Sequence, residues 1–121
     1  MKIAETIAEV REQVRTWRKE GLAVGLVPTM GYLHEGHKSL IDRAVEENDR
    51  VVVSVFVNPI QFGPSEDLAS YPRDLKRDAA LCEAAGADLV FHPSDGEMYF
   101  DDFCTYVVMD DLTKVLCGKT R

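Results

Sequence analysis

The hydrophobic residues of this chain fall into two kinds of pattern. Runs with the composition of strands cover residues 22–27, 51–57 and 88–91. Apolar residues recur instead at helical spacing, with polar residues between them, over residues 7–17, 36–48 and 72–85. Short, continuously apolar runs are typical of strands buried on both faces of a parallel sheet. The alternation of strands and helices therefore predicts an α/β fold, a Rossmann-like three-layer sandwich with a parallel sheet.

Weaker signals lie at the two ends of the chain. Residues 2–3 suggest a short first strand, and residues 97–99 suggest a short turn of helix. Residues 104–109 have strand composition, followed by a helical turn through Leu116. Because an exposed strand edge tends to pair with another chain, this last segment predicts a homodimer.

The stretch of most chemical interest joins the first apolar run to the helix that follows it. Pro28 lacks an N–H and is expected to end the strand. A helix that begins near Gly36 would point the positive end of its dipole into the crossing, which favours phosphate. Gly36 has no Cβ, so a ligand could approach the backbone there. His34 and His37 flank that glycine and could donate hydrogen bonds to phosphate oxygens.

Two other interpretations of this histidine pair are weaker. A zinc site would need a third ligand nearby and, on a helix, a wider spacing between the two histidines. Ordinary surface or core histidines are the commonest case, but the strand before and the helix after the pair count against it. The chain also lacks the glycine patterns of a dinucleotide fold or a P-loop.

A second polar loop, residues 58–61, follows the second apolar run. Ligands of open parallel sheets bind outside the carboxyl ends of the strands, so the two loops should share one cleft. Asp78 is expected on the solvated flank of its helix, with a role in holding the Mg²⁺ of ATP as the alternative. His92, also at a strand end, is expected to be a loop histidine, with a place in the cleft as the alternative.

Composition restricts the function further. The 121 residues are 45% hydrophobic and 29% charged, as in a globular protein with one domain and a real core. The net charge of −7 argues against nucleic acid as a partner. The three scattered cysteines indicate reduced thiols and a cytoplasmic protein, and nothing in the sequence indicates a membrane span.

Two stretches carry a resemblance to a known family. "VPTMGYLHEGHKSL" and "SVFVNPIQFGPSEDLASYPRD" closely resemble the pantothenate synthetases, or pantoate–β-alanine ligases, of the nucleotidyltransferase superfamily with its His-x-Gly-His signature. The signature alone is moderately specific for the family, but the long matches that flank it make the resemblance strong. The resemblance covers the whole chain and implies a longer enzyme. Residues 1–121 would be its N-terminal nucleotide-binding domain, with the C-terminal part absent.

The resemblance also implies a reaction. The carboxylate of pantoate attacks the α-phosphorus of ATP, which carries Mg²⁺, and pyrophosphate leaves. The amine of β-alanine then attacks the pantoyl adenylate, giving pantothenate and AMP. Two rival interpretations remain: a folded but inactive fragment of such a ligase, and an adenylyl- or cytidylyltransferase of the same superfamily.

Particular residues follow from the family's motifs. His37 would donate a proton to the phosphate that carries the departing charge, and His34 would assist at the same oxygens. Gln61 would bind the substrate pantoate. Backbone N–H groups would do much of the work of holding the nucleotide, along a segment made up of Met30, Gly31, Tyr32, Leu33, His34, Glu35, Gly36 and His37.

Overall fold

The computed structural model describes residues 1–57 and 73–98. Its elements, in chain order, are β1 (Lys2–Ala4), α1 (Ile7–Lys19), β2 (Val24–Thr29), α2 (Glu35–Glu47), β3 (Arg50–Val55), α3 (Leu75–Ala85), β4 (Leu89–Phe91) and α4 (Asp95–Met98). The predicted alternation of strands and helices is confirmed. The strand expected at residues 104–109 and the helical turn after it lie outside the described residues, as does the loop at 58–61.

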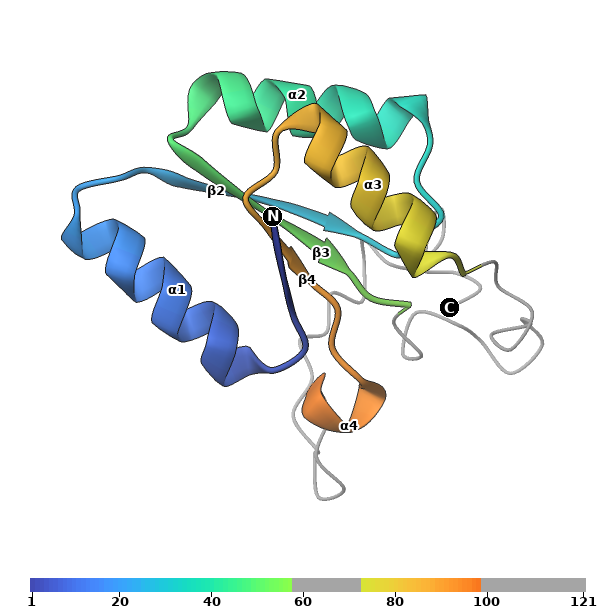
Figure 1. Ribbon diagram of the computed structural model, residues 1–121, viewed down its shortest axis with the longest axis horizontal. Helices are drawn as coiled ribbons and strands as arrows, with labels where there is room; N and C mark the ends of the chain where they lie inside the picture. Colours follow the sequence, from blue (N-terminus) through green and yellow to red (C-terminus); the bar gives the residue numbers. More distant parts are fainter. Residues whose placement is uncertain (58–72, 99–121) are drawn as a thin grey trace, which may run out of the picture.

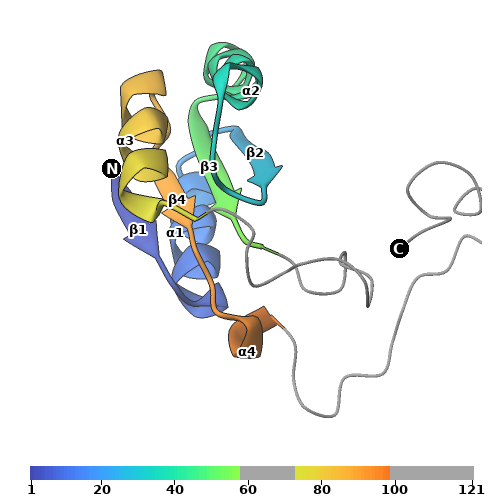
Figure 2. The same ribbon diagram turned by 90° about the vertical axis from the view of Figure 1, so that its right-hand side faces the viewer.

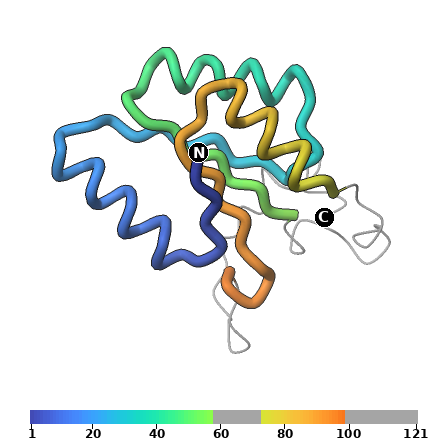
Figure 3. Tube along the Cα trace, in the orientation of Figure 1, coloured from blue at the N-terminus to red at the C-terminus, as the bar shows by residue number. Residues whose placement is uncertain are grey.

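The strands form one parallel sheet in the order β1-β4-β3-β2. The N-terminal strand therefore lies beside the last one, with Ile3 opposite Val90, although the two are far apart in sequence (Figure 3). All carboxyl ends point to the same edge of the sheet. The loops that leave β2, β3 and β4 are thereby brought together.

The helices cover the sheet on both faces and make three layers. Helix α1 lies on one face, while α2 and α3 lie on the other (Figures 1 and 2). Alternate residues of β3 serve the two resulting cores: Val51, Val53 and Val55 pack on the α2 and α3 side, and Val52 packs on the α1 side with Trp17. The predicted sandwich and the double-sided burial of this strand are thus confirmed.

Strand β2 ends later than the sequence predicts, because it continues through Pro28 to Thr29. That residue lies opposite Ser54 in the ladder with β3. The carbonyl of the next residue, Thr29, accepts a hydrogen bond from the Phe56 N–H at 3.0 Å, so the polar groups of Thr29 face β3. The backbone N–H and C=O groups of successive strand residues point in opposite directions, so the nitrogen of Pro28 points away from β3. On that side of β2, no strand of residues 1–57 and 73–98 pairs with it. Proline is tolerated there because no donor is required.

Helix ends follow local capping rules. The side chain of Thr6 accepts a hydrogen bond from the Glu9 N–H at 3.2 Å and starts α1. Helix α3 starts later than its expected first turn at residue 72, because Asp74 is its N-cap and accepts from the Arg77 N–H at 3.1 Å. Gly86 closes α3 with a φ of 98°.

Two findings concern the wider class of protein. Among residues 1–57 and 73–98, no helix has the length and apolarity to cross a membrane. Cys82 is a free, buried cysteine, and burial, helped by the charge of Asp78, raises the pKa of its thiol to about 11. Cys104 and Cys117 lie outside the described residues.

Candidate functional site

The loop from β2 to α2 turns sharply through two successive residues with positive φ. Gly31 has a φ of 85° and Tyr32 a φ of 50°. The left-handed conformation is costly for a residue with a side chain, so the surroundings must hold Tyr32 in place. A Cβ on Gly31 would also lie 3.1 Å from Val55 Cγ1 and 3.3 Å from Asp78 Oδ2, a tight fit that adds to the cost of the positive φ for any other residue. The turn returns the chain to the sheet, where Leu33 is fully buried in the core.

Asp78, on α3, fixes this turn through hydrogen bonds to its backbone. Its carboxylate accepts hydrogen bonds from the backbone N–H groups of Tyr32 at 2.7 Å and Leu33 at 2.8 Å. The residue is 1% exposed. The expected place on a solvated flank is therefore wrong. Asp78 instead lies on the buried face of α3. Its carboxylate can be buried there because it accepts two charge-assisted hydrogen bonds from backbone N–H groups.

Two neighbours complete the support of the turn. Thr29 Oγ1 donates to the Ser54 carbonyl at 2.9 Å and accepts from the Gly31 N–H at 3.2 Å. On the outer side, the guanidinium of Arg77 lies over the Tyr32 ring, 4.8 Å from its centroid. Such cation–π contacts contribute modestly at exposed positions. The loop is thus fixed by α3 as well as by its own strand.

The two histidines form a reciprocal cap at the start of α2. His34 is the N-cap, and its Nδ1 accepts a hydrogen bond from the Gly36 N–H at 3.0 Å. His37, at the third helical position, uses its own Nδ1 to accept from the His34 N–H at 3.1 Å. The ring centroids are 4.0 Å apart. This is the geometry of a capping box, with imidazoles in place of the usual hydroxyl and carboxylate.

These bonds determine where each imidazole carries its proton. An Nδ1 that accepts a hydrogen bond is unprotonated, so the neutral rings of His34 and His37 carry the proton on Nε2. Burial, followed by the neighbouring His34, lowers the pKa of His37, against an opposing effect of Asp78. The pair therefore offers two neutral Nε2–H donors at the positive end of a helix dipole.

Five backbone N–H groups of the same segment already have partners within the chain. The N–H groups of residues 31–34 bond to Thr29, Asp78 and His37, and that of Gly36 bonds to His34. The expectation that backbone N–H groups of this segment hold the nucleotide stays a prediction, and these five amides would have to share or exchange their present partners to do so. The side-chain Nε2–H groups are the donors that the fold leaves available at the two histidines.

Acidification should loosen this cap. The folded state lowers the pKa of His37, so the unfolded chain binds more protons between the lowered value and the ordinary one of about 6.5. The contribution of the neutral His37 to the stability of the folded state is therefore complete above that pH range, and it is lost as the pH falls through the range. We expect the His34 amide to lose protection from hydrogen exchange on acidification, measured by NMR after correction for intrinsic rates. The Asn48 amide, which bonds to Ala44 at the other end of α2, is the control, and equal behaviour of the two amides would contradict the prediction.

Gly36 makes room for the imidazole of His34. A Cβ there would lie 2.7 Å from His34 Cε1, so the absent side chain makes room for the imidazole. The expectation that a ligand approaches the backbone at Gly36 stays a prediction beside this packing role. We expect Gly36→Ala to displace the His34 ring and weaken its bond to the residue 36 amide. The NMR shifts of the His34 ring would report it, with Gly96→Ala, which meets nothing within 4 Å, as the control.

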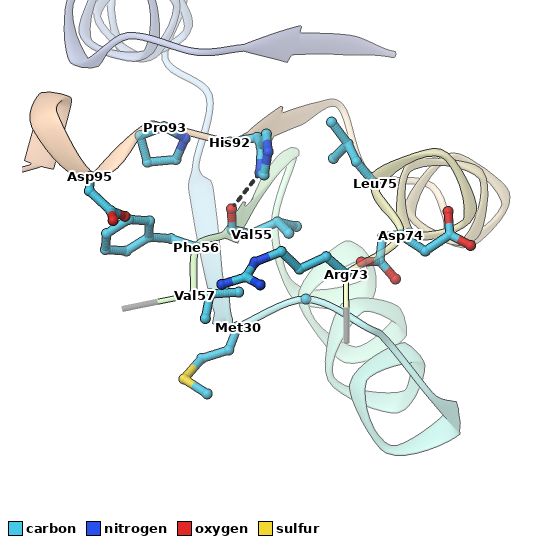
Figure 4. A pocket seen from close by; sticks show the side chains of 12 residues that line it. Met30, Val55, Phe56, Val57, Arg73, Asp74, Leu75, His92, Pro93 and Asp95 are labelled. Carbon is cyan, nitrogen blue, oxygen red and sulfur yellow. Dashed lines mark hydrogen bonds between the residues drawn. The ribbon is translucent and has the colours of Figure 1, made fainter. Parts of the chain in front are cut away.

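A cavity of about 430 Å³ opens at the carboxyl edge of the sheet (Figure 4). This size is typical of sites for small molecules. The carboxyl ends of β2, β3 and β4 and the first turn of α3 contribute its lining, which consists of Met30, Gly31, Val55, Phe56, Val57, Arg73, Asp74, Leu75, Asp78, His92, Pro93 and Asp95. The prediction of a cleft at this edge is confirmed for the described part of the chain.

The structure places the predicted site residues in three groups. Met30 and Gly31 line the cavity, whereas the exposed His34, Glu35 and Gly36 and the half-buried His37 form the start of α2. The exposed ring of Tyr32, between these two groups, lies under the Arg77 guanidinium. Leu33 belongs to the core. Gln61 lies outside the described residues.

His92 lines the cavity, which was the less favoured alternative for it. The feature of the sequence that indicated a place in the cavity for His92 is its position directly after a predicted strand. No group of three or more histidine, cysteine or acidic side chains suited to a metal ion occurs in the two described segments.

Comparison with known proteins identifies the family. The family model described as pantoate-beta-alanine ligase matches residues 2–121. The chain belongs to this family. Pantothenate synthetases are among its relatives: that of Clostridium acetobutylicum is 60% identical over 121 residues, and that of Clostridium novyi is 63% identical over 115 residues. These matches cover 100% and 95% of the chain but 43% and 41% of the two relatives. The chain thus spans less than half the length of these pantoate–β-alanine ligases.

Solved structures of the family share the fold. Pantothenate synthetase from Thermus thermophilus is 51% identical with a TM-score of 0.86, and the match covers 100% of this chain and 42% of that one. The ligase from Francisella tularensis, complexed with beta-gamma ATP and beta-alanine, is 38% identical with a TM-score of 0.84. That match covers 100% of this chain and 46% of the other. The parallel α/β fold predicted from the sequence is therefore the fold of this family.

Proposed function

We propose that this chain provides the nucleotide-binding part of a pantoate–β-alanine ligase, which makes pantothenate from pantoate, β-alanine and ATP. The observation that carries the proposal is the pair of Nε2–H donors at the start of α2, beside the cavity at the carboxyl edge of the sheet. Family membership and a relative complexed with beta-gamma ATP and beta-alanine support it.

The reaction has two steps. In the first, a carboxylate oxygen of pantoate forms a bond to the α-phosphorus of ATP, and the bond from that phosphorus to the bridging oxygen of pyrophosphate breaks. In the second, the amine of β-alanine forms an amide bond to the acyl carbon, loses a proton and displaces AMP. Negative charge builds on the departing pyrophosphate in the first step, so that step gains most from fixed hydrogen-bond donors.

His37 and His34 have the chemistry to stabilise that charge. We assign His37 as the principal donor to the phosphate that carries the departing charge, with His34 at the same oxygens. Neutral imidazoles suit this role because their Nε2–H groups are held ready by the Nδ1 bonds to the backbone. Little reorganisation is then needed during the reaction.

The other components of the proposal have less local support. Mg²⁺ would be bound chiefly by the phosphates of ATP and by water, the arrangement that this ion favours, and Asp78 is occupied with the loop. Gln61 would bind the carboxylate or hydroxyls of pantoate. A homodimer and a cytoplasmic location complete the proposal, the latter supported by the free thiol of Cys82.

The decisive experiment separates a working nucleotide site from an inert fold. NMR spectra of the 121-residue chain titrated with ATP should show saturable shifts at His34 and His37. In the complete protein, pantoate, β-alanine and ATP should yield pantothenate, AMP and pyrophosphate. Shifts without pantothenate would favour the adenylyl- or cytidylyltransferase alternative. A complete protein that neither binds ATP nor makes product would exclude the proposal, whereas failure of the fragment alone would identify it as an inert piece of the enzyme.

A further inference from the structure

His92 joins three strands at the cavity edge. It follows β4 directly, and its backbone N–H donates to the Ala4 carbonyl at 2.8 Å, which ties it to β1. Its imidazole Nδ1 lies 2.9 Å from the carbonyl oxygen of Val55, the last residue of β3 (Figure 4). The side chain is half-buried and lines the cavity described above.

The imidazole of His92 adds one hydrogen bond to the ladder between β3 and β4, at a point where the backbone of β4 has no donor to offer. The register between β3 and β4 ends with Ser54 opposite Phe91. The chain then reaches Pro93, which has no N–H with which to extend the pairing. The side chain of His92 supplies the missing donor to the Val55 carbonyl, because a half-buried carbonyl without a partner is costly.

This bond fixes the tautomer of His92 in the sense opposite to that of the two motif histidines. A carbonyl oxygen can only accept, so Nδ1 must carry the proton that it donates. In the neutral ring, Nε2 then has a free lone pair. Within residues 1–57 and 73–98, the Val55 carbonyl is the hydrogen-bond partner of this ring, and Nε2 has none. In that neutral form, the cavity wall contains a hydrogen-bond acceptor of fixed orientation.

We propose that Nε2 of His92 accepts a hydrogen bond from a hydroxyl group of the acyl substrate. The inference rests on the proposed function, in which that substrate is the dihydroxy acid pantoate. Phosphate oxygens of ATP and carboxylates are acceptors and gain nothing from a lone pair at Nε2. The adjoining walls contributed by Val55, Leu75 and Pro93 are apolar and suit the branched hydrocarbon part of such an acid.

The uncharged lone pair of Nε2 suits a hydroxyl better than the ammonium of β-alanine, for which the cavity offers carboxylates instead. Of the three carboxylates in the lining, those of Asp74 and Asp78 accept backbone hydrogen bonds, whereas Asp95 lies beyond Pro93, at the start of α4. A neutral ring satisfies an uncharged donor without leaving a charge to compensate. His92 therefore acts as a specificity-determining residue for the hydroxylated substrate.

Two variants separate this role from the structural bond to Val55. In His92→Asn, the amide nitrogen is one bond from Cγ, as Nδ1 is, so it can still donate to the carbonyl while the Nε2 acceptor is lost. In His92→Phe, the ring shape remains and both nitrogens are lost.

We expect the asparagine variant of the complete protein to keep the melting temperature of the wild type. It should bind pantoate about three- to tenfold more weakly by calorimetry, which is the loss expected for one neutral hydrogen bond. ATP affinity should be unchanged. His92→Phe, which keeps the ring shape and also loses the bond to Val55, should lower the melting temperature and weaken pantoate binding at least as much. Wild-type pantoate affinity in a stable asparagine variant would overturn the inference.

Imidazole ¹⁵N spectra of the wild-type protein provide a test that does not depend on any variant. Free protein should show His92 protonated on Nδ1, and saturation with pantoate should move the Nε2 signal in the direction of an accepted hydrogen bond. An Nε2-protonated ring, an unmoved signal at saturation, or a shift produced by β-alanine in place of pantoate would each overturn the assignment. If pantoate does not bind the wild-type protein at all, the proposed function fails as well, which distinguishes the two failures.

Discussion

Replacing His37 by alanine in the complete enzyme is expected to slow formation of the adenylate by about 10²-fold or more, the scale seen when one transition-state donor is removed. We expect this effect because His37 occupies the third position of α2, where its Nδ1 accepts from the His34 N–H and its Nε2–H is left to donate. Pyrophosphate release in a single turnover measures the step directly.

A matched variant separates catalysis from capping. Glutamine is a normal partner at the third position of a capping box, so His37→Gln should keep the bond to the His34 N–H. It lacks the imidazole Nε2–H. We therefore expect His37→Gln to preserve the melting temperature while losing most of the rate. A glutamine variant with the wild-type rate would show that His37 is a helix cap and has no part in the chemistry.

The fold could be predicted because its signals are local. The run from Val51 to Val53 is apolar at every position, which only a strand covered on both faces requires, and β3 is such a strand. Thr6 and Gly86 mark helix ends through bonds to their own neighbours in sequence. Pro28 misled the prediction of the end of β2, because its effect depends on whether the strand lies at an edge, which a local pattern does not reveal.

The site could be predicted only in part, for the same reason. The spacing of His34 and His37 equals that of the N-cap and third residue of a capping box, so the reciprocal cap could have been recognised from sequence. Asp78 could not. Its partners are backbone amides 46 and 45 residues away, and backbone groups leave no trace in a sequence pattern. The orientation of His92 likewise depends on the Val55 carbonyl, 37 residues distant.

Asp78→Asn should destabilise the fold strongly. The buried carboxylate accepts two hydrogen bonds, and bonds to charged groups contribute about 1.5–3 kcal/mol each. An asparagine keeps the shape, but its NH₂ group must face one of the two amides, which leaves a buried N–H unpaired. We expect the free energy of unfolding to fall by about 3 kcal/mol or more, measured by urea denaturation. Because the Gly31–Tyr32 turn depends on these bonds, ATP affinity should fall with it.

Asp42→Asn is the matched control for this loss. Asp42 is exposed and pairs with Lys38 at 3.0 Å on the surface of α2, where such pairs contribute less than about 1 kcal/mol. Both substitutions remove one negative charge and keep the side-chain shape, so their difference isolates the two buried bonds. If Asp78→Asn lost no more stability than Asp42→Asn, the strained conformation of Tyr32 would have to be held by other contacts. Loss of ATP affinity at unchanged stability would instead mean that Asp78 acts on the nucleotide or its Mg²⁺ directly.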